Sequence, residues 1–239
     1  FTFDFGYSWS TKQKISQMLL RGAYPSLCLS VPSFVISTIL SLLISLVVAF
    51  YRGRGIDHFV RFICIAAVSI SALTYILFFQ HFFAFQLGWF EISGFEYGFP
   101  QFIPYIILPS IIYILLSLGP DVRFFRTVVL DEIYQDYVRT ARAKGLSEVL
   151  ILIKHVLKNA LIPIFTYIII QIPFLVLGAL LLENFFGIPG LGGITLNALN
   201  SSDFPVVKAM ATLSAVAYIV FNILTDILYH LVDPRMKIK

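Results

Sequence analysis

The sequence predicts an all-α, polytopic membrane protein. Of its 239 residues, 59% are hydrophobic and only 13% are charged, whereas soluble domains are about 45–50% apolar and about 25% charged. The apolar residues form long continuous runs rather than the alternating pattern of membrane-spanning strands. The 24 Phe and 12 Tyr suit a surface that faces lipid. These observations exclude a disordered chain and argue against a water-soluble globule.

Five stretches are long enough to cross a bilayer as helices, which takes about 20 mostly apolar residues. They lie between Arg21 and Arg52, between Arg61 and Glu91, between Glu96 and Asp121, over residues 159–182, and from Lys208 to Asp233 with Asp226 inside. Pro32, Pro109 and Pro173 are not expected to break these helices, because neighbouring helices in a membrane satisfy the backbone groups that a proline frees.

The basic residues predict the orientation of the spans. Of 17 Lys and Arg, 13 fall in segments 51–61, 119–158 and 233–239, which leaves 4 for the other side. Cytoplasmic loops carry the excess of Lys and Arg, so these segments and the C-terminus are expected in the cytoplasm. Five spans then place Phe1 outside. Because the first residues do not resemble a signal peptide, we expect at least one further span upstream; the alternative is an external N-terminus.

The chain is expected to comprise an external segment, 1–22, and one transmembrane domain, 23–239, with a distinct cytoplasmic element at about 128–158. Apolar or small residues recur there with the period of an amphipathic helix: Leu130, Ile133, Tyr134, Tyr137, Val138 and Ala141. Gly145 can end this helix, and Ser147 can cap a second one. The helix–Gly–helix element could lie on lipid headgroups or dock a soluble partner. Its charges of both signs favour docking.

Segments 136–147 and 154–163 resemble the cytoplasmic signature of ABC-importer permeases, in the variant of the dipeptide/oligopeptide/nickel branch. Most such permeases carry Glu-Ala-Ala, three residues and Gly. Here Arg139-Thr140-Ala141 and Gly145 occupy those positions, so the departures point to the peptide branch. Segments 4–8, 183–192 and 222–235 are similar to the B-type subunit of that branch.

The resemblance implies a type I ABC-importer permease fold in the inner membrane of a bacterial cell. It implies transport of peptides, or of a related solute such as nickel, and no enzymatic activity. Its expected partners are a homologous second permease, two cytoplasmic ABC ATPases, an external solute-binding protein and the lipid bilayer, with no nucleic acid. ATP and Mg²⁺ would be bound by the ATPases, and this chain would hold no cofactor. The residues expected to couple to the ATPase are Asp136, Arg139, Thr140, Ala141, Arg142, Gly145, Leu146 and Ser147.

Other polar or small residues are weaker candidates. Gln171, Gly190 and Gly192 could contact the pathway or an external partner, and a tight turn or a polar helix contact would explain them equally well. Asn222, Asp226 and Tyr229 are expected to form a structural polar cluster near the end of the last span.

Two other classes of function remain open at this point. An acid within a span can carry ion coupling, so a secondary transporter using Asp226 is the alternative to the importer. A membrane anchor that transports nothing is a third possibility. No G-x-x-x-x-G-K-[ST], H-E-x-x-H or G-x-S-x-G motif occurs, so the sequence offers no P-loop and no sign of these catalytic centres.

Overall fold

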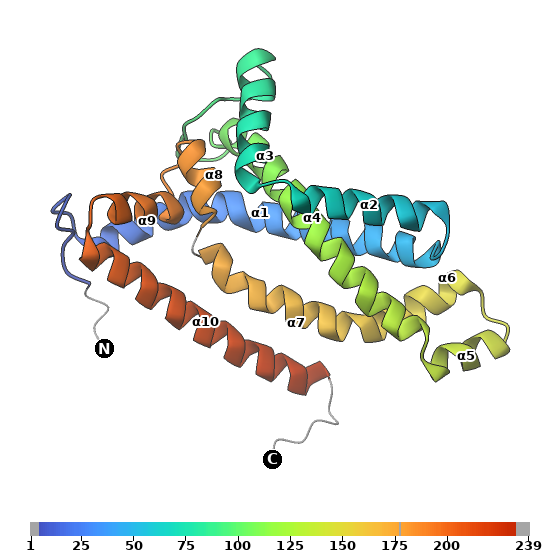
Figure 1. Cartoon of the computed structure of the whole chain (residues 1–239). Helices are drawn as coiled ribbons and strands as arrows, with labels where there is room; N and C mark the ends of the chain where they lie inside the picture. The colour runs from blue at the N-terminus through green and yellow to red at the C-terminus, as the bar shows by residue number, and fades with distance from the viewer. Residues whose placement is uncertain (1–4, 177, 233–239) are drawn as a thin grey trace. The chain divides into compact units, whose positions relative to one another are not determined.

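The computed structural model describes residues 5–176 and 178–232, except the side chains of residues 176, 226 and 228–232. Within those ranges it contains helices and no β-strand, only an isolated bridge between Tyr7 and Lys14. The predicted all-α fold is therefore confirmed. The elements are α1 (Ile15–Phe50), α2 (Gly55–Ser69), α3 (Ala72–Phe79), the π-helix η1 (Gln80–Gln86), α4 (Ile103–Ile133), α5 (Asp136–Ala143), α6 (Glu148–Ile151), the π-helix η2 (Leu152–Val156), α7 (Leu157–Val176), α8 (Leu180–Phe185), α9 (Leu191–Asn200) and α10 (Phe204–Val232) (Figure 1).

The described residues contain four candidate spans and a fifth that is bent. The four are α1, α4, the region Glu148–Phe185 and α10, while the fifth combines α2 with α3 and η1, which meet at 91°. The bend falls within the stretch predicted as the second span, because Ile70 and Ser71 adopt extended backbone conformations between α2 and α3. Hydropathy continues through that point and gives no sign of the bend.

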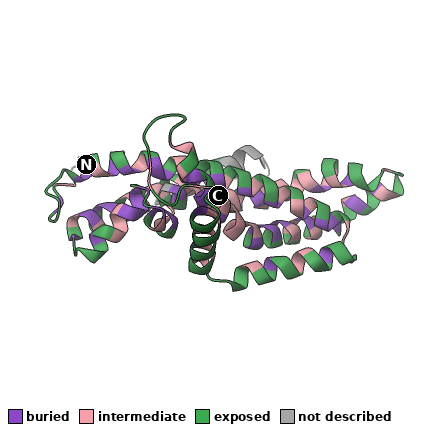
Figure 2. Ribbon diagram, turned by 90° about the horizontal axis from the view of Figure 1, so that it is seen from above, coloured by how far each residue is buried: buried purple, intermediate pink, exposed green. Residues whose placement is uncertain are grey.

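Six of the seven serines of α1 lie on one face and are buried, each with 1% or less of its surface exposed. They are Ser26, Ser30, Ser33, Ser37, Ser41 and Ser45, spaced by three or four residues as one helix face requires. Exposed residues of α1 include Val35, Ile39 and Leu43. A helix with small polar residues inside and aliphatic ones outside suits lipid, since small residues permit close helix packing there. Figure 2 shows exposed residues along the long helices.

The chain divides into two compact units. Unit 1 comprises Phe1–Phe34, Ser71–Tyr113 and Ile170–Ile223, and unit 2 comprises the remaining segments. In unit 1, the start of α1 packs against α9 and α10 through Ile15, Leu19, Leu191, Ala198, Val206, Ala209 and Met210. In unit 2, the end of α1 packs with α4, α5, α6, η2 and α7 through Ala49, Phe125, Val129, Ile133, Val138, Ala141, Ile151, Val156, Ala160 and Ile164.

Candidate functional site

The turn between α5 and α6 has the local structure that its sequence predicts. Gly145 has a φ of +77°, a conformation that glycine adopts at little cost, and its N–H donates to the Arg142 carbonyl at 2.9 Å. Ser147 caps α6, since its Oγ accepts from the N–H of Leu150 at 3.4 Å. The predicted helix–Gly–helix order is confirmed.

The single amphipathic helix expected over residues 130–141 is wrong. Helix α4 continues to Ile133, the chain breaks at residues 134–135, where Gln135 is extended, and α5 begins at Asp136. Tyr134, expected on the apolar face, is 65% exposed because it lies in the break. The apolar series still converges on one core, since Ile133, Val138 and Ala141 are buried together.

Polar contacts also fix α5 on its neighbours within unit 2. The Tyr137 hydroxyl donates to Glu132 Oε2 at 2.5 Å, and burial together with this bond raises the pKa of Tyr137 to about 12. Arg142 donates from Nε and Nη2 to the two carboxylate oxygens of Glu148, at 2.7 and 3.1 Å. This fork joins α5 to α6 and raises the pKa of Arg142. Helix α5 is thus held by packing and by hydrogen bonds.

The predicted coupling residues divide between the surface and the interior of unit 2. Asp136, Arg139 and Thr140 are exposed on α5, and Gly145 and Ser147 are exposed after it. Arg139 lies 3.3 Å from Asp136, and both side chains are more than 70% exposed. In contrast, Ala141 is buried, while Arg142 and Leu146 are half-buried. The five exposed residues, Asp136, Arg139, Thr140, Gly145 and Ser147, form what we call the α5 surface.

Unit 1 contains a buried acid that the sequence analysis did not single out. Glu183, on α8, is 0% exposed. Its Oε1 accepts from Ser26 Oγ at 2.7 Å and from the N–H of Ala179 at 3.1 Å, and its Oε2 accepts from the N–H groups of Gly192 and Gly193 at 2.7 and 3.2 Å. We call Glu183 and these four donors the Glu183 cage. Because two of the N–H groups belong to the first turn of α9, the acid also caps that helix.

Glycines surround the Glu183 cage because no side chain fits there. A Cβ at Gly178 or Gly190 would collide with the Glu183 carboxylate, and one at Gly192 would also lie 2.6 Å from the Leu180 Cα. Gly190 and Gly192 therefore have a packing role in the structure, while their contact with the pathway or an external partner stays a prediction. Gln171 lies half-buried on α7 and is not part of the cage.

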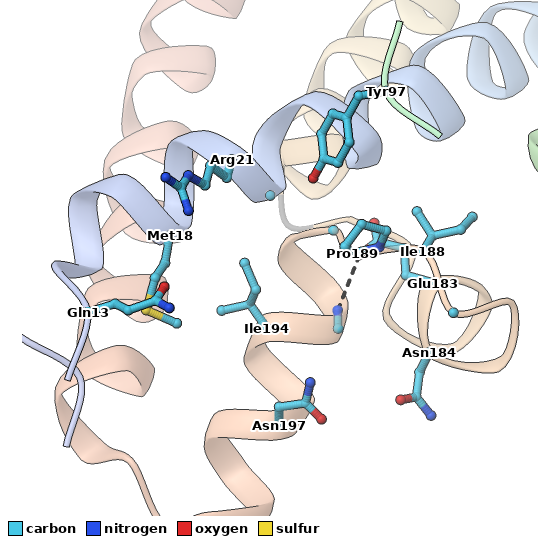
Figure 3. Close-up of a pocket in the computed structure, with 14 residues that line it drawn as sticks. Gln13, Met18, Arg21, Tyr97, Glu183, Asn184, Ile188, Pro189, Ile194 and Asn197 are labelled. Carbon is cyan, nitrogen blue, oxygen red and sulfur yellow. Dashed lines mark hydrogen bonds between the residues drawn. The ribbon is translucent and has the colours of Figure 1, made fainter. Parts of the chain in front are cut away.

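A cavity of about 420 Å³ lies beside the Glu183 cage within unit 1. Figure 3 shows side chains reaching it from the start of α1, from the loop that carries Tyr97, and from α9. Its walls are Gln13, Met18, Arg21, Gly22, Tyr97, Glu183, Asn184, Gly187, Ile188, Pro189, Gly190, Gly193, Ile194 and Asn197. It is large enough for a small ligand, because such sites enclose about 300–1,000 Å³.

A second buried acid of unit 1, Asp203, holds the segment before α1. Its carboxylate accepts from Ser8 Oγ at 2.5 Å, from Ser10 Oγ at 2.8 Å, and from the N–H groups of Trp9 and Ser10, both at 3.1 Å. Burial alone would raise the pKa of Asp203, but these hydrogen bonds outweigh it and hold the pKa well below its ordinary value. The acid thereby ties residues 8–10 to the start of α10.

A buried ion pair joins α2 to α4 in unit 2. Arg126 donates from Nε and Nη2 to the two oxygens of Asp57, both at 2.9 Å, and the Gly53 N–H donates to the same carboxylate at 2.9 Å. The Asp57 side chain is 3% exposed. The sequence separation of Asp57 and Arg126, 69 residues, concealed the pair from sequence reasoning.

The predicted polar cluster of the last span is only partly described. Asn222 is half-buried on α10, whereas the side chains of Asp226 and Tyr229 lie outside the described residues. In the part of the chain that the structure describes, no group of three or more His, Cys, Asp or Glu could hold a metal ion.

Comparison with known proteins identifies a family. Residues 41–238 match the family described as "Binding-protein-dependent transport system inner membrane component". The chain is 31% identical over 241 residues to the glutathione transport system permease protein of Salmonella typhimurium strain LT2, covering 99% of this chain and 76% of the relative. The corresponding proteins of Shigella flexneri serotype 5b and Escherichia coli strain K12 are 30% and 29% identical over 236 residues, with the same coverage.

These relatives confirm several expectations from the sequence. They are transport permeases rather than enzymes, and they support the peptide branch of importers over an ion-coupled secondary transporter. They also support a multi-pass inner-membrane protein, in accord with the candidate spans. The chain therefore belongs to the family of binding-protein-dependent transport system inner membrane components, the permeases of ABC importers.

Proposed function

We propose that this chain forms half of the translocation pathway of an ATP-driven importer of short peptides. The relatives are named for the transport of glutathione, itself a short peptide, which supports this class of cargo over nickel. The other half would come from a homologous second permease, and an external solute-binding protein would deliver the cargo. The basic residues of segments 51–61, 119–158 and 233–239 support a cytoplasmic position for α5 and for the C-terminus.

Two ABC ATPases would supply the energy, binding ATP and Mg²⁺ themselves because this chain has no P-loop motif. Their closure would drive the spans between inward-open and outward-open states, a rigid-body transition. The observation that carries this proposal is the α5 surface, which exposes Asp136, Arg139 and Thr140 on a helix whose other face is buried in the unit 2 core.

The packing of α5 against its neighbours explains how docking could move the spans. Val138 and Ala141 share one core with residues of α4, η2 and α7, and Tyr137 is hydrogen-bonded to Glu132 on α4. Because close-packed interiors transmit displacement rather than absorb it, a force on the α5 surface would pass into α4 and α7.

Cysteine cross-linking tests the docking. Thr140→Cys places a thiol on the α5 surface, and Thr127→Cys places one at another exposed threonine, on α4. Cys28 and Cys64 are replaced first. In the assembled complex we expect Thr140→Cys to cross-link to the ATPase and Thr127→Cys to remain unlinked. Equal cross-linking of both, or of neither while the ATPase co-purifies, would refute docking through α5.

The Gly145 turn provides a test of coupling. A Cβ at Gly145 has no atom within 4 Å, so only the positive φ resists substitution. Asn tolerates this conformation better than a β-branched residue does. We expect Gly145→Val to uncouple ATP hydrolysis from peptide uptake and Gly145→Asn to retain coupling. Uptake that persists without any ATPase but disappears in Asp226→Asn would favour ion coupling instead.

A further inference from the structure

We propose that the cavity beside the Glu183 cage binds the carboxylate of a small solute, with Arg21 as the cationic partner. This inference rests on the proposed function, because it assigns a step of cargo handling to the permease itself. It concerns unit 1 alone, since every residue lining the cavity belongs to that unit.

Arg21 has no ion-pair partner among the residues that the structure describes. Among residues 5–176 and 178–232, the ion pairs involve other residues, and no carboxylate lies within 4 Å of the Arg21 guanidinium. An arginine offers a planar fork of donors that matches a carboxylate. Arg21 can therefore receive a carboxylate from outside the chain without giving up an existing pair.

The two buried acids of unit 1, Glu183 and Asp203, accept hydrogen bonds from internal donors. Glu183 lines the cavity, yet its two oxygens accept the four hydrogen bonds of the cage. Asp203 is enclosed by Ser8, Trp9 and Ser10. Among the described residues neither carboxylate forms an ion pair with Arg21, so the Arg21 guanidinium can accept a carboxylate from outside the chain.

The remaining walls favour a short peptide with a free C-terminal carboxylate. The amides of Gln13, Asn184 and Asn197 can hydrogen-bond polar groups of the ligand, and Met18 and Ile194 offer apolar contact (Figure 3). Imidazole or thiolate ligands, which transition metals prefer, are absent from the residues that line the cavity. The cavity therefore lacks the side chains that a Ni²⁺ ion prefers, whereas an anionic group can bind Arg21.

A pair of probes tests the site directly. The assembled complex is placed in lipid nanodiscs without its binding protein, and binding of the dipeptide alanyl-phenylalanine is compared with binding of its C-terminal amide. We expect the acid to bind about ten-fold more tightly than the amide, the range of a charge-assisted hydrogen-bonded contact. Arg21→Gln should abolish that preference, and Lys14→Gln, an exposed cation outside the cavity, should leave it intact.

Several outcomes would overturn the inference. Wild-type protein that binds acid and amide equally would exclude a carboxylate site, as would an Arg21→Gln variant that still prefers the acid. If Arg21→Gln instead weakens only the affinity for the binding protein, the carboxylate comes from that protein and not from the solute. ATP-driven uptake of either dipeptide by wild-type proteoliposomes is measured in parallel. If uptake occurs but the carboxylate preference is absent, only the proposed site is refuted. If uptake is absent, the proposed importer function is refuted.

Discussion

The buried acids Glu183 and Asp203 of unit 1 and the acids near the α5 surface of unit 2 act in opposite ways. In unit 1, Glu183 and Asp203 are buried and accept most of their hydrogen bonds from backbone N–H and serine hydroxyl groups. Near the α5 surface in unit 2, Asp136 and Glu148 are exposed and pair with arginines. Buried acids of the first kind fix the path of the backbone, whereas exposed pairs leave a charged surface open to a partner.

The contrast predicts different sensitivity to substitution. A buried donor that loses its partner costs about 1–3 kcal/mol, and an exposed ion pair contributes about 0–1 kcal/mol. Changes around Glu183 should therefore disturb folding, whereas changes on the α5 surface should disturb coupling and leave the fold intact.

Glu183→Ala should have the largest effect. It leaves the donors of Ser26, Ala179, Gly192 and Gly193 without their acceptor in a buried site, so we expect a loss of about 3–5 kcal/mol. Thermal unfolding of the detergent-solubilised protein measures it. The control is Glu91→Ala, at an exposed acid; equal shifts in the two variants would show that the cage contributes no special stability.

Gly192→Ala should be the next most disruptive change. Its Cβ would lie 2.6 Å from the Leu180 backbone, and overpacking of this kind costs about 1–3 kcal/mol. Gly55→Ala is the matched control, because a Cβ there has no atom within 4 Å and Gly55 begins a helix. The same unfolding assay should show a clear shift for the first variant and almost none for the second; similar shifts would mean that the backbone of α8 and α9 relaxes freely.

What the sequence could predict follows from how local each signal is. The Ser147 cap and the Gly145 turn depend on residues within a few positions, and both predictions are confirmed. The spans depend on hydropathy over about 20 residues and are confirmed apart from the bend after Ser69. The break before Asp136 was missed because the amphipathic series continues through it.

The cage and the cavity depend on contacts between distant residues. Ser26 and Glu183 are 157 positions apart, and a single sequence gives no indication of which serine meets which acid. One signal was available, however, because the serines of α1 recur on a single helical face from Ser26 to Ser45. Such a series predicts a buried polar face on a span, and Glu183 is a rare acid near the end of another.

The hydrogen bonds that Asp203 accepts from residues 8–10 should make the stability of the fold depend on pH on the acid side. Because its pKa in the folded state lies below its ordinary value, its contribution is full above about pH 4 and is lost as the pH falls further. In Asp203→Asn we expect a loss of about 2 kcal/mol at neutral pH and a shallower decline of the melting temperature between about pH 5 and about pH 3. A slope equal to that of the wild type would show that other acids account for acid unfolding; Glu91→Gln is the control.

The smallest effect is expected at the Arg142–Glu148 fork. The two side chains are 34% and 50% exposed, so a double-mutant cycle of Arg142→Ala and Glu148→Ala should give a coupling energy below about 1 kcal/mol in the isolated chain, weakened further by salt. Docking of a partner on the α5 surface would remove water from this pair. Since charge pairs interact more strongly when desolvated, the coupling energy should rise in the assembled complex. An unchanged value in the complex would place the fork outside the contact and confine docking to Asp136, Arg139 and Thr140.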